Sequence, residues 1–458
     1  MSLQPEFETY SYAGVVVRAK AQSVVECRLS GVGELGNPLA LRAALSLSSA
    51  EAGNGEVKYS GKVVFSALYE DAEKNVCRLE RGAEFAHHAQ DERITPALTP
   101  RVTLRVISTS LRREGASVYA SCVVEADVVL DGAKTVDYLS GGENIVCRKD
   151  LQSVYREEYT SGAIEVSDEF DADYVGDVLM HGETVNVQRV TAAAGSIIVS
   201  GEVAVNVCVL KKDGLGNVER PLPFRAELPL DAASDGMPCD GSVSVQSAAI
   251  NVTADEEGGK SKISLLVSLF VAGMVWAKEN LSVAVDAFGL TNRLTLTTAQ
   301  SAGEYKKDSL TFTERVNGVA SLSAPIDYSC ALQALVLQTV EADCRADGDG
   351  EEIQGVVSAV LLVSESDGAH RSVQVQLPFA LPFRSEVKGR RAVKAMALGV
   401  SARQKREGEV EVEATLKMTV DIYDTWRVDY LSSAQEGAPV QEPDCAFSVF
   451  LPRVGDSL

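Results

Sequence analysis

The strict alternation of residues 410–422 constrains the fold more than any other feature of this sequence. Its apolar positions are Val410, Val412, Ala414, Leu416, Met418, Val420 and Ile422, and polar residues stand between all of them. A period of two is typical of a β-strand with one face on a core and the other in water. The turn 405–408 and the apolar run 393–402 precede it, so we expect a β-hairpin here.

The same hairpin pattern occurs twice more, around the turns 112–115 and 255–259. Upstream of each hairpin a glycine opens a strand and a phenylalanine follows it; the pairs are Gly61 and Phe85, Gly201 and Phe224, and Gly355 and Phe379. These separations are 24, 23 and 24 residues, and the three glycines precede the hairpin-turn glycines Gly115, Gly258 and Gly408 by 54, 57 and 53 residues. Each copy closes on a similar tetrapeptide, at 136–139, 285–288 and 428–431. The sequence therefore predicts three tandem copies of one unit.

A chain of 458 residues has room for about three domains. We expect the first repeat over 10–150, the second over 151–300 and the third over 301–445, followed by a tail over 446–458. Polar linkers with short extended pieces are expected at 154–174 and 298–324. Helix is scarce, with 38–49 as the best candidate. The expected fold class is mainly β, with three tandem antiparallel β-sandwich-like domains and few helices.

Three motifs in this order resemble a known family: the glycine-led strands (GKVVFSALYED, GEVAVNVCVLKKDG), the LPF segments and the closing Val-Asp-Tyr. Over roughly residues 10–445 the chain resembles the SPOCS-domain proteins of clostridial sporulation, the SipL-like proteins of spore-coat morphogenesis. The first copy departs most, with Glu84-Phe85 where the others have Pro-Phe. The tail is similar to the opening of a LysM module, which commonly follows SPOCS repeats and would be truncated here.

The resemblance implies a non-enzymatic scaffold of spore-coat or envelope assembly that binds coat proteins, with the SpoIVA ATPase as a candidate partner. In that family the LysM module provides much of the binding, so the expected partner-binding residues are Arg453, Val454, Gly455, Asp456, Ser457 and Leu458. One alternative is a cell-envelope protein that binds glycan through the missing LysM module. Another, less favoured, is a nucleotide-binding enzyme.

Charge and cysteine usage set the expected location. The net charge of −22 should repel nucleic acid and anionic membrane surfaces. The longest apolar run, 265–276, is shorter than the roughly 20 residues that a membrane helix needs, and no secretory signal is evident. Nine scattered cysteines without a CxxC pair are typical of reduced thiols. We expect the mother-cell cytoplasm, in association with the forespore coat.

The motifs that could carry chemistry are weak. Gly31, Gly33 and Gly36 spell a dinucleotide fingerprint, but Asn37-Pro38 follows and no βαβ alternation accompanies it. The acidic run 347–352 lacks a calcium pattern, since Arg345 stands where its first aspartate would be. Adjacent histidines such as His87 and His88 point to opposite faces of a strand. We therefore expect no catalytic residues, no metal and no cofactor.

Exposed sheet edges are a further candidate for binding. A long strand such as 410–422 would offer unpaired backbone groups to a partner or to a second copy if it lay at an edge. Coverage of each edge within its own domain is the favoured interpretation.

Overall fold

The computed structural model describes residues 4–29, 37–114, 117–173, 175–212, 214–255, 259–347 and 350–439. Within these ranges the chain contains strands and turns but no helix, and every strand pairing is antiparallel. The prediction of a mainly β, antiparallel fold is confirmed. The helix predicted at 38–49 is wrong, because these residues lie in β2 (Asn37–Ala52), where Leu41 and its apolar neighbours pack against the first core.

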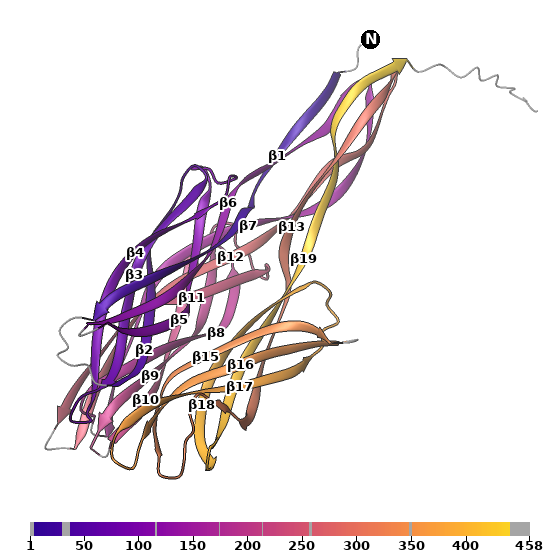
Figure 1. The fold of residues 1–458 in the computed structure, drawn as a ribbon. Coiled ribbons are helices and arrows are strands. Elements are labelled where there is room, and N and C mark those ends of the chain that lie inside the picture. The colour runs from indigo at the N-terminus through magenta and orange to yellow at the C-terminus, as the bar shows by residue number, and fades with distance from the viewer. Residues whose placement is uncertain are drawn as a thin grey trace, which may run out of the picture.

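The chain repeats one topology three times (Figure 1). The first unit contains β1 (Gln4–Leu29), β2, β3 (Glu56–Glu70), β4 (Val76–Gln90), β5 (Thr99–Glu114) and β6 (Ser117–Glu143). The second contains β7 (Ile145–Asp173), β8 (Val178–Ala193), β9 (Ser196–Lys211), β10 (Gly214–Pro229), β11 (Cys239–Asp255) and β12 (Lys260–Gly289). The third contains β13 (Asn292–Val319), β14 (Ser321–Leu322), β15 (Ala331–Asp347), β16 (Gly350–Ser364), β17 (His370–Phe383), β18 (Arg390–Arg406) and β19 (Glu409–Pro439).

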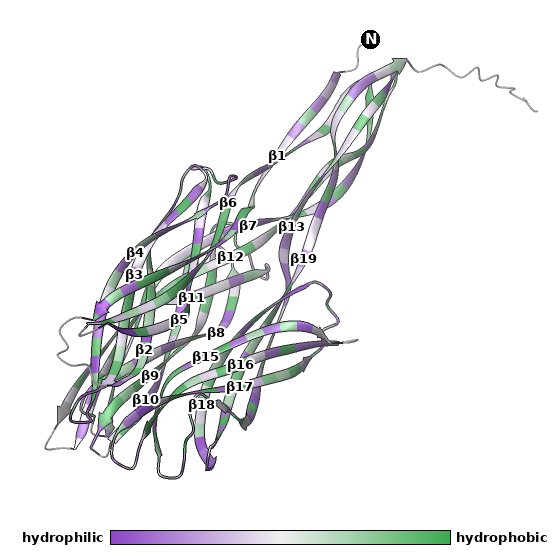
Figure 2. Cartoon of the chain, in the orientation of Figure 1, coloured by the Kyte–Doolittle hydropathy of each residue, from purple (hydrophilic) through white to green (hydrophobic). Residues whose placement is uncertain are grey.

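Each unit is a sandwich of two sheets around its own core. One sheet holds the first, last and penultimate strands, in the orders β1-β6-β5, β7-β12-β11 and β13-β19-β18. The other sheet holds the remaining strands, with β3, β9 or β16 flanked on both sides. The alternating residues 410–422 behave as predicted, since Val410 and Ile422 are both fully buried. Figure 2 shows the alternation of hydrophobic and hydrophilic positions along the strands.

The recurring glycine and phenylalanine are direct neighbours across two strands. Gly201 of β9 pairs with Phe224 of β10, as Gly61 pairs with Phe85 and Gly355 with Phe379. A Cβ at Gly201 would collide with the carbonyl oxygen of Asn186 in β8 and would press on the Phe224 ring. The same collision occurs at Gly61 and Gly355. Close approach of two strands therefore requires glycine at this position in every unit.

The first and last strands of each unit continue past the sandwich and form a stalk (Figure 1). β1 pairs with β6, β7 with β12 and β13 with β19 along nearly their whole lengths. The three two-stranded ribbons share an apolar interior of their own, which contains Leu139, Ala284 and Leu431. A two-stranded ribbon is only marginally stable alone, so the stalk depends on packing among all three units.

A further apolar cluster joins the three sandwiches below the stalk. It contains Leu39, Ala40, Leu68 and Val76 of the first unit, Leu179, Met180 and Cys208 of the second, and Ala334, Val336 and Leu362 of the third. Residues from equivalent strands thus meet around a common axis. The molecule has pseudo-threefold symmetry within a single chain.

Several sequence expectations need correction. The stretches 154–174 and 298–324 are not linkers, because 154–173 lies in β7 and 298–319 lies in β13. The predicted divisions after residues 150 and 300 fall inside these two strands.

The closing tetrapeptide of the second unit was also misplaced. A β-bulge follows Leu139, Ala284 and Leu431, so these three positions are equivalent. The counterpart of residues 136–139 is therefore 281–284 and not 285–288.

Candidate interaction surfaces

The residues proposed from sequence for partner binding and nucleotide binding lie outside the described residues. This holds for Arg453, Val454, Gly455, Asp456, Ser457 and Leu458, and for Gly31, Gly33 and Gly36. Of the acidic run 347–352, Glu351 accepts hydrogen bonds from Arg391 at 3.0 and 3.1 Å. An arginine partner occupies the carboxylate that a cation would need.

The paired histidines lie on β4. The His87 ring stacks on Phe85 with 5.6 Å between ring centroids. Burial of the ring lowers the pKa of His87, and the charge of the neighbouring His88 lowers it further. Among the residues that the structure describes, no group of three or more His, Cys, Asp or Glu side chains is placed to hold a metal ion.

The strand of residues 410–422 offers no free edge. It is part of β19, which is the central strand of its sheet and pairs with β13 on one side and β18 on the other. Val420, for example, faces both Leu310 and Val393. Partner recognition by strand addition at 410–422 is therefore excluded.

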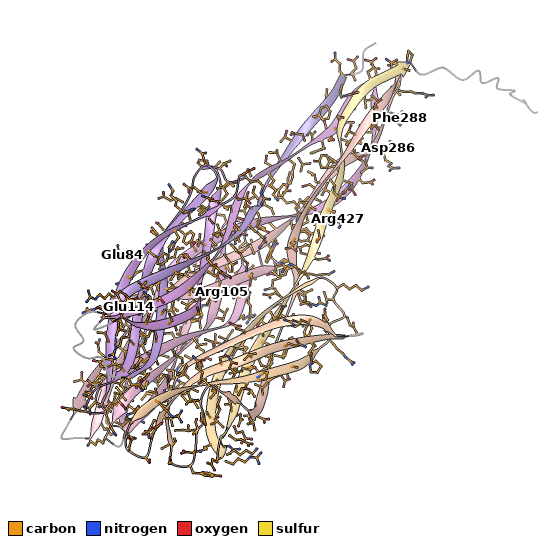
Figure 3. All side chains as sticks on the ribbon, viewed as in Figure 1. Glu84, Arg105, Glu114, Asp286, Phe288 and Arg427 are labelled. Carbon is orange, nitrogen blue, oxygen red and sulfur yellow. The ribbon has the colours of Figure 1, made fainter. Side chains whose placement is uncertain are left out.

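Apolar side chains are exposed at the end of the stalk instead. Phe288 is 57% exposed and lies near the end furthest from the sandwiches (Figure 3). Its cross-strand neighbour Val146 is 41% exposed, and Leu290, two residues further along, is 60% exposed. Directly paired residues and residues two apart share one face of a ribbon. Val146 and Phe288 therefore share one face of the ribbon, and the exposed Leu290 follows directly after the end of β12; we call these three residues the tip surface.

The sequence did contain a signal for the tip surface. Val285-Asp286-Ala287-Phe288 matches the Val-Asp-Tyr-Leu of the other copies only in part, and in the strand register these four residues lie beyond the β-bulge that follows Ala284. Without the strand register, the Ala-Phe of residues 287–288 is indistinguishable from ordinary sequence variation in a closing motif.

The outer faces of the three main sheets differ in chemistry. Phe270 of β12 is equivalent to Glu125 of β6 and Lys417 of β19. Each lies the same number of residues before the β-bulge of its strand. Glu125 binds Arg105 at 2.6 Å, and Lys417 donates to Asn186 Oδ1 at 2.6 Å. Phe270 makes no such polar contact and is 41% exposed. At this position the second unit thus presents an apolar side chain where the other two present a charged one.

Two junctions between units hold ionic groups of opposite polarity. Between the first and second units, Arg101 donates to Tyr159, which donates to Glu157 at 2.6 Å. Between the second and third, the equivalent positions carry Asp240 and Lys306, which pair at 3.2 Å. The acid and the base have exchanged places between the two junctions.

Asp421 strengthens the second of these junctions. Its carboxylate is fully buried and binds Lys306 at 2.7 Å and Lys394 at 3.0 Å. Burial alone would raise the pKa of Asp421, but the ammonium groups of Lys394 and Lys306 outweigh it and hold the pKa below its ordinary value. Both lysines also bind Asp240 of the second unit, at 3.2 Å each, so the network joins the third unit to the second.

The third junction has no equivalent pair, because its two positions are Ala392 and Val15. Val15 lines a cavity of about 380 Å³ at the base of the stalk, to which all three units contribute.

No helix in the described part of the chain is long and apolar enough to cross a membrane. Comparison of the chain with models of protein families, with curated proteins and with solved structures finds no match.

Proposed function

We propose that this protein is a non-enzymatic structural scaffold of spore-coat or envelope assembly. It acts in the mother-cell cytoplasm, in association with the forespore coat, and binds coat proteins, with the SpoIVA ATPase as a candidate partner. The observation that carries the proposal is the tip surface of Val146, Phe288 and Leu290, held away from the sandwiches by the stalk.

The tip surface supports a binding role for a physical reason. Exposed large apolar side chains gathered on one face mark sites of protein interaction more often than single exposed residues do. The stalk keeps them apart from the rest of this acidic molecule, so a partner can cover them without meeting the bulk of the −22 charge.

The resemblance to SPOCS-domain proteins supplies the biological context of the proposal. The ordered motifs behind it include the glycine and phenylalanine that meet across two strands in every unit.

The test is capture of coat proteins from sporulating clostridial cells, with the captured proteins identified by mass spectrometry. The baits are the wild-type chain, the double variant F288E/L290E and the control V24E. Val24 is 63% exposed on a sandwich, so V24E adds a charge to an exposed apolar site away from the stalk. Loss of the partly exposed Phe288 and Leu290 surfaces should cost about 2 kcal/mol, roughly thirtyfold in affinity.

The expected result is recovery of the same coat proteins by the wild type and V24E, with strong loss in F288E/L290E. Recovery of no coat protein by the wild-type bait would contradict the scaffold proposal. Equal recovery by all three baits would remove the tip surface as its binding site.

A further inference from the structure

The cavity at the base of the stalk is lined by residues of all three units. Residues 12–16 of β1 line it consecutively, and β1 is the outer strand of its sheet. Tyr155 and Trp426 contribute aromatic side chains to the wall, and Gly303 allows the Trp426 ring to lie directly against the backbone. A volume of about 380 Å³ lies within the range of small-molecule sites.

Two cations on the cavity wall lack partners. Arg18 and Lys134 both line the cavity, and neither forms a hydrogen bond or ion pair with any described residue. Arg93 also lines it but is held by Asp91 at 2.9 and 2.7 Å. The unpaired charge on the wall is therefore positive, in a chain whose net charge is −22.

The acidic groups of the wall are already engaged. Glu157 accepts a hydrogen bond from Tyr159 at 2.6 Å, and Glu304 accepts two from Arg390 at 3.0 and 3.2 Å. Arg390 neutralises Glu304, whereas the neutral Tyr159 leaves the charge of Glu157 in place. Two free cations against one unneutralised carboxylate leave the wall with a net positive charge.

Pseudo-symmetry shows that the unpaired Arg18 is particular to the first unit. Counting back from the bulges, Arg18 is equivalent to Tyr159 and Ser309. Tyr159 accepts a hydrogen bond from Arg101, and Ser309 donates one to Asp421 at 2.8 Å. In the other two units this position is satisfied within the protein.

The position of Lys134 behaves in the same way. Its equivalents are Glu279 and Trp426. Glu279 accepts a hydrogen bond from Tyr10 at 2.5 Å, and Trp426 packs edge-on against Tyr12 with 5.4 Å between centroids. Only the first unit places an unpaired cation at both positions, and both cations face one cavity.

We propose that this cavity binds a small organic anion, with its phosphate or carboxylate group at Arg18 and Lys134 and a flat apolar group beside Tyr155. Charge-assisted hydrogen bonds from the two cations would hold the anionic group. One face of the Tyr155 ring is stacked on Tyr305 with 3.9 Å between ring centroids. Its other face and the methyl groups of Val15 and Val16 would cover the apolar part. The proposal is independent of any role in the spore coat.

Isothermal titration calorimetry on the full chain at fixed ionic strength provides the test. The probes are phenyl phosphate, benzoate and inorganic phosphate, which separate the phosphate, carboxylate and apolar contributions. We expect one saturable site for phenyl phosphate or benzoate. Inorganic phosphate should bind at least tenfold more weakly than phenyl phosphate, because it lacks the ring.

Three variants and one control locate the site. R18Q and K134Q should each weaken binding at least tenfold, because each removes one charge-assisted contact. A302L changes no charge and should weaken binding by filling the cavity that Ala302 lines. R28Q removes the same charge from the same strand away from the cavity and should bind like the wild type.

The proposal fails if neither phenyl phosphate nor benzoate binds saturably to the wild-type chain. It also fails if R18Q and K134Q bind as tightly as R28Q, or if inorganic phosphate binds as tightly as phenyl phosphate. Circular dichroism of each variant confirms that a loss of binding does not come from unfolding.

Discussion

Substitution of Gly201 by alanine should destabilise the second unit through the backbone. The added Cβ would collide with the Asn186 carbonyl oxygen and lie 3.0 Å from the carbonyl carbon and from Phe224 Cζ. A side chain could rotate away from such a collision, but a carbonyl held in the ladder between β8 and β9 cannot. The two strands must separate instead.

The magnitude follows from two opposing effects. Overpacking a well-packed site costs about 1–3 kcal/mol, and the rigid backbone partner places Gly201 at the upper end. Replacing glycine restricts the unfolded chain and returns about 0.4–1 kcal/mol. We expect G201A to lower the free energy of unfolding by about 2 kcal/mol.

Gly182 provides the matched control on the neighbouring strand β8. A Cβ there meets no atom within 4 Å, so G182A should leave stability unchanged or raise it by less than about 1 kcal/mol. Urea unfolding followed by far-ultraviolet circular dichroism measures both variants. Equal stability of G201A and G182A would refute the proposed strand collision.

Two further predictions concern ionisable groups. The folded-state pKa of Asp421 lies below its unfolded value of about 3.9. Its ion pairs therefore stabilise the fold fully above about pH 4, and this stabilisation is lost as the pH falls through the folded-state pKa. D421N should therefore lower the free energy of unfolding, measured in urea at pH 7, by about 3 kcal/mol and should make stability less dependent on pH in the acid range. An unchanged dependence of stability on acid pH would contradict this role of Asp421. Burial raises the pKa of Cys208 to about 12, so a thiol reagent at pH 8 should leave Cys208 unlabelled in the native protein and label it in urea. Peptide mapping that finds Cys208 labelled as fast as the half-buried Cys27 would refute that prediction.

The sandwiches were largely predictable because their residues obey local rules. Residues 410–422 alternate because one side faces a core, and the separation of Gly201 from Phe224 is that of two partners across one hairpin. Both signals lie within a short stretch of chain. Pattern analysis can therefore recover them without knowledge of the neighbouring units.

The stalk was missed because its apolar positions are satisfied by other units. In β7, Val154 is buried among side chains of the first and third units, while much of 155–173 is polar or exposed. Such a strand looks like a linker when it is considered alone. The cavity depends on packing among all three units, so no local motif revealed it. The tip surface lies within the second unit, and its sequence signal at Phe288 could be interpreted only with the strand register.

Covalent connection of the three units changes how such an assembly can form and diversify. Three separate chains would associate only above a threshold concentration, whereas linked units meet at a fixed effective concentration however dilute the protein is. Identical chains would also carry identical residues at every junction. Here Arg101 and Glu157 lie at one junction, and Asp240 and Lys306 lie at the next with the acid and the base exchanged. The last junction has no such pair and borders the cavity. A single gene product can thus give each of three related sites its own chemistry.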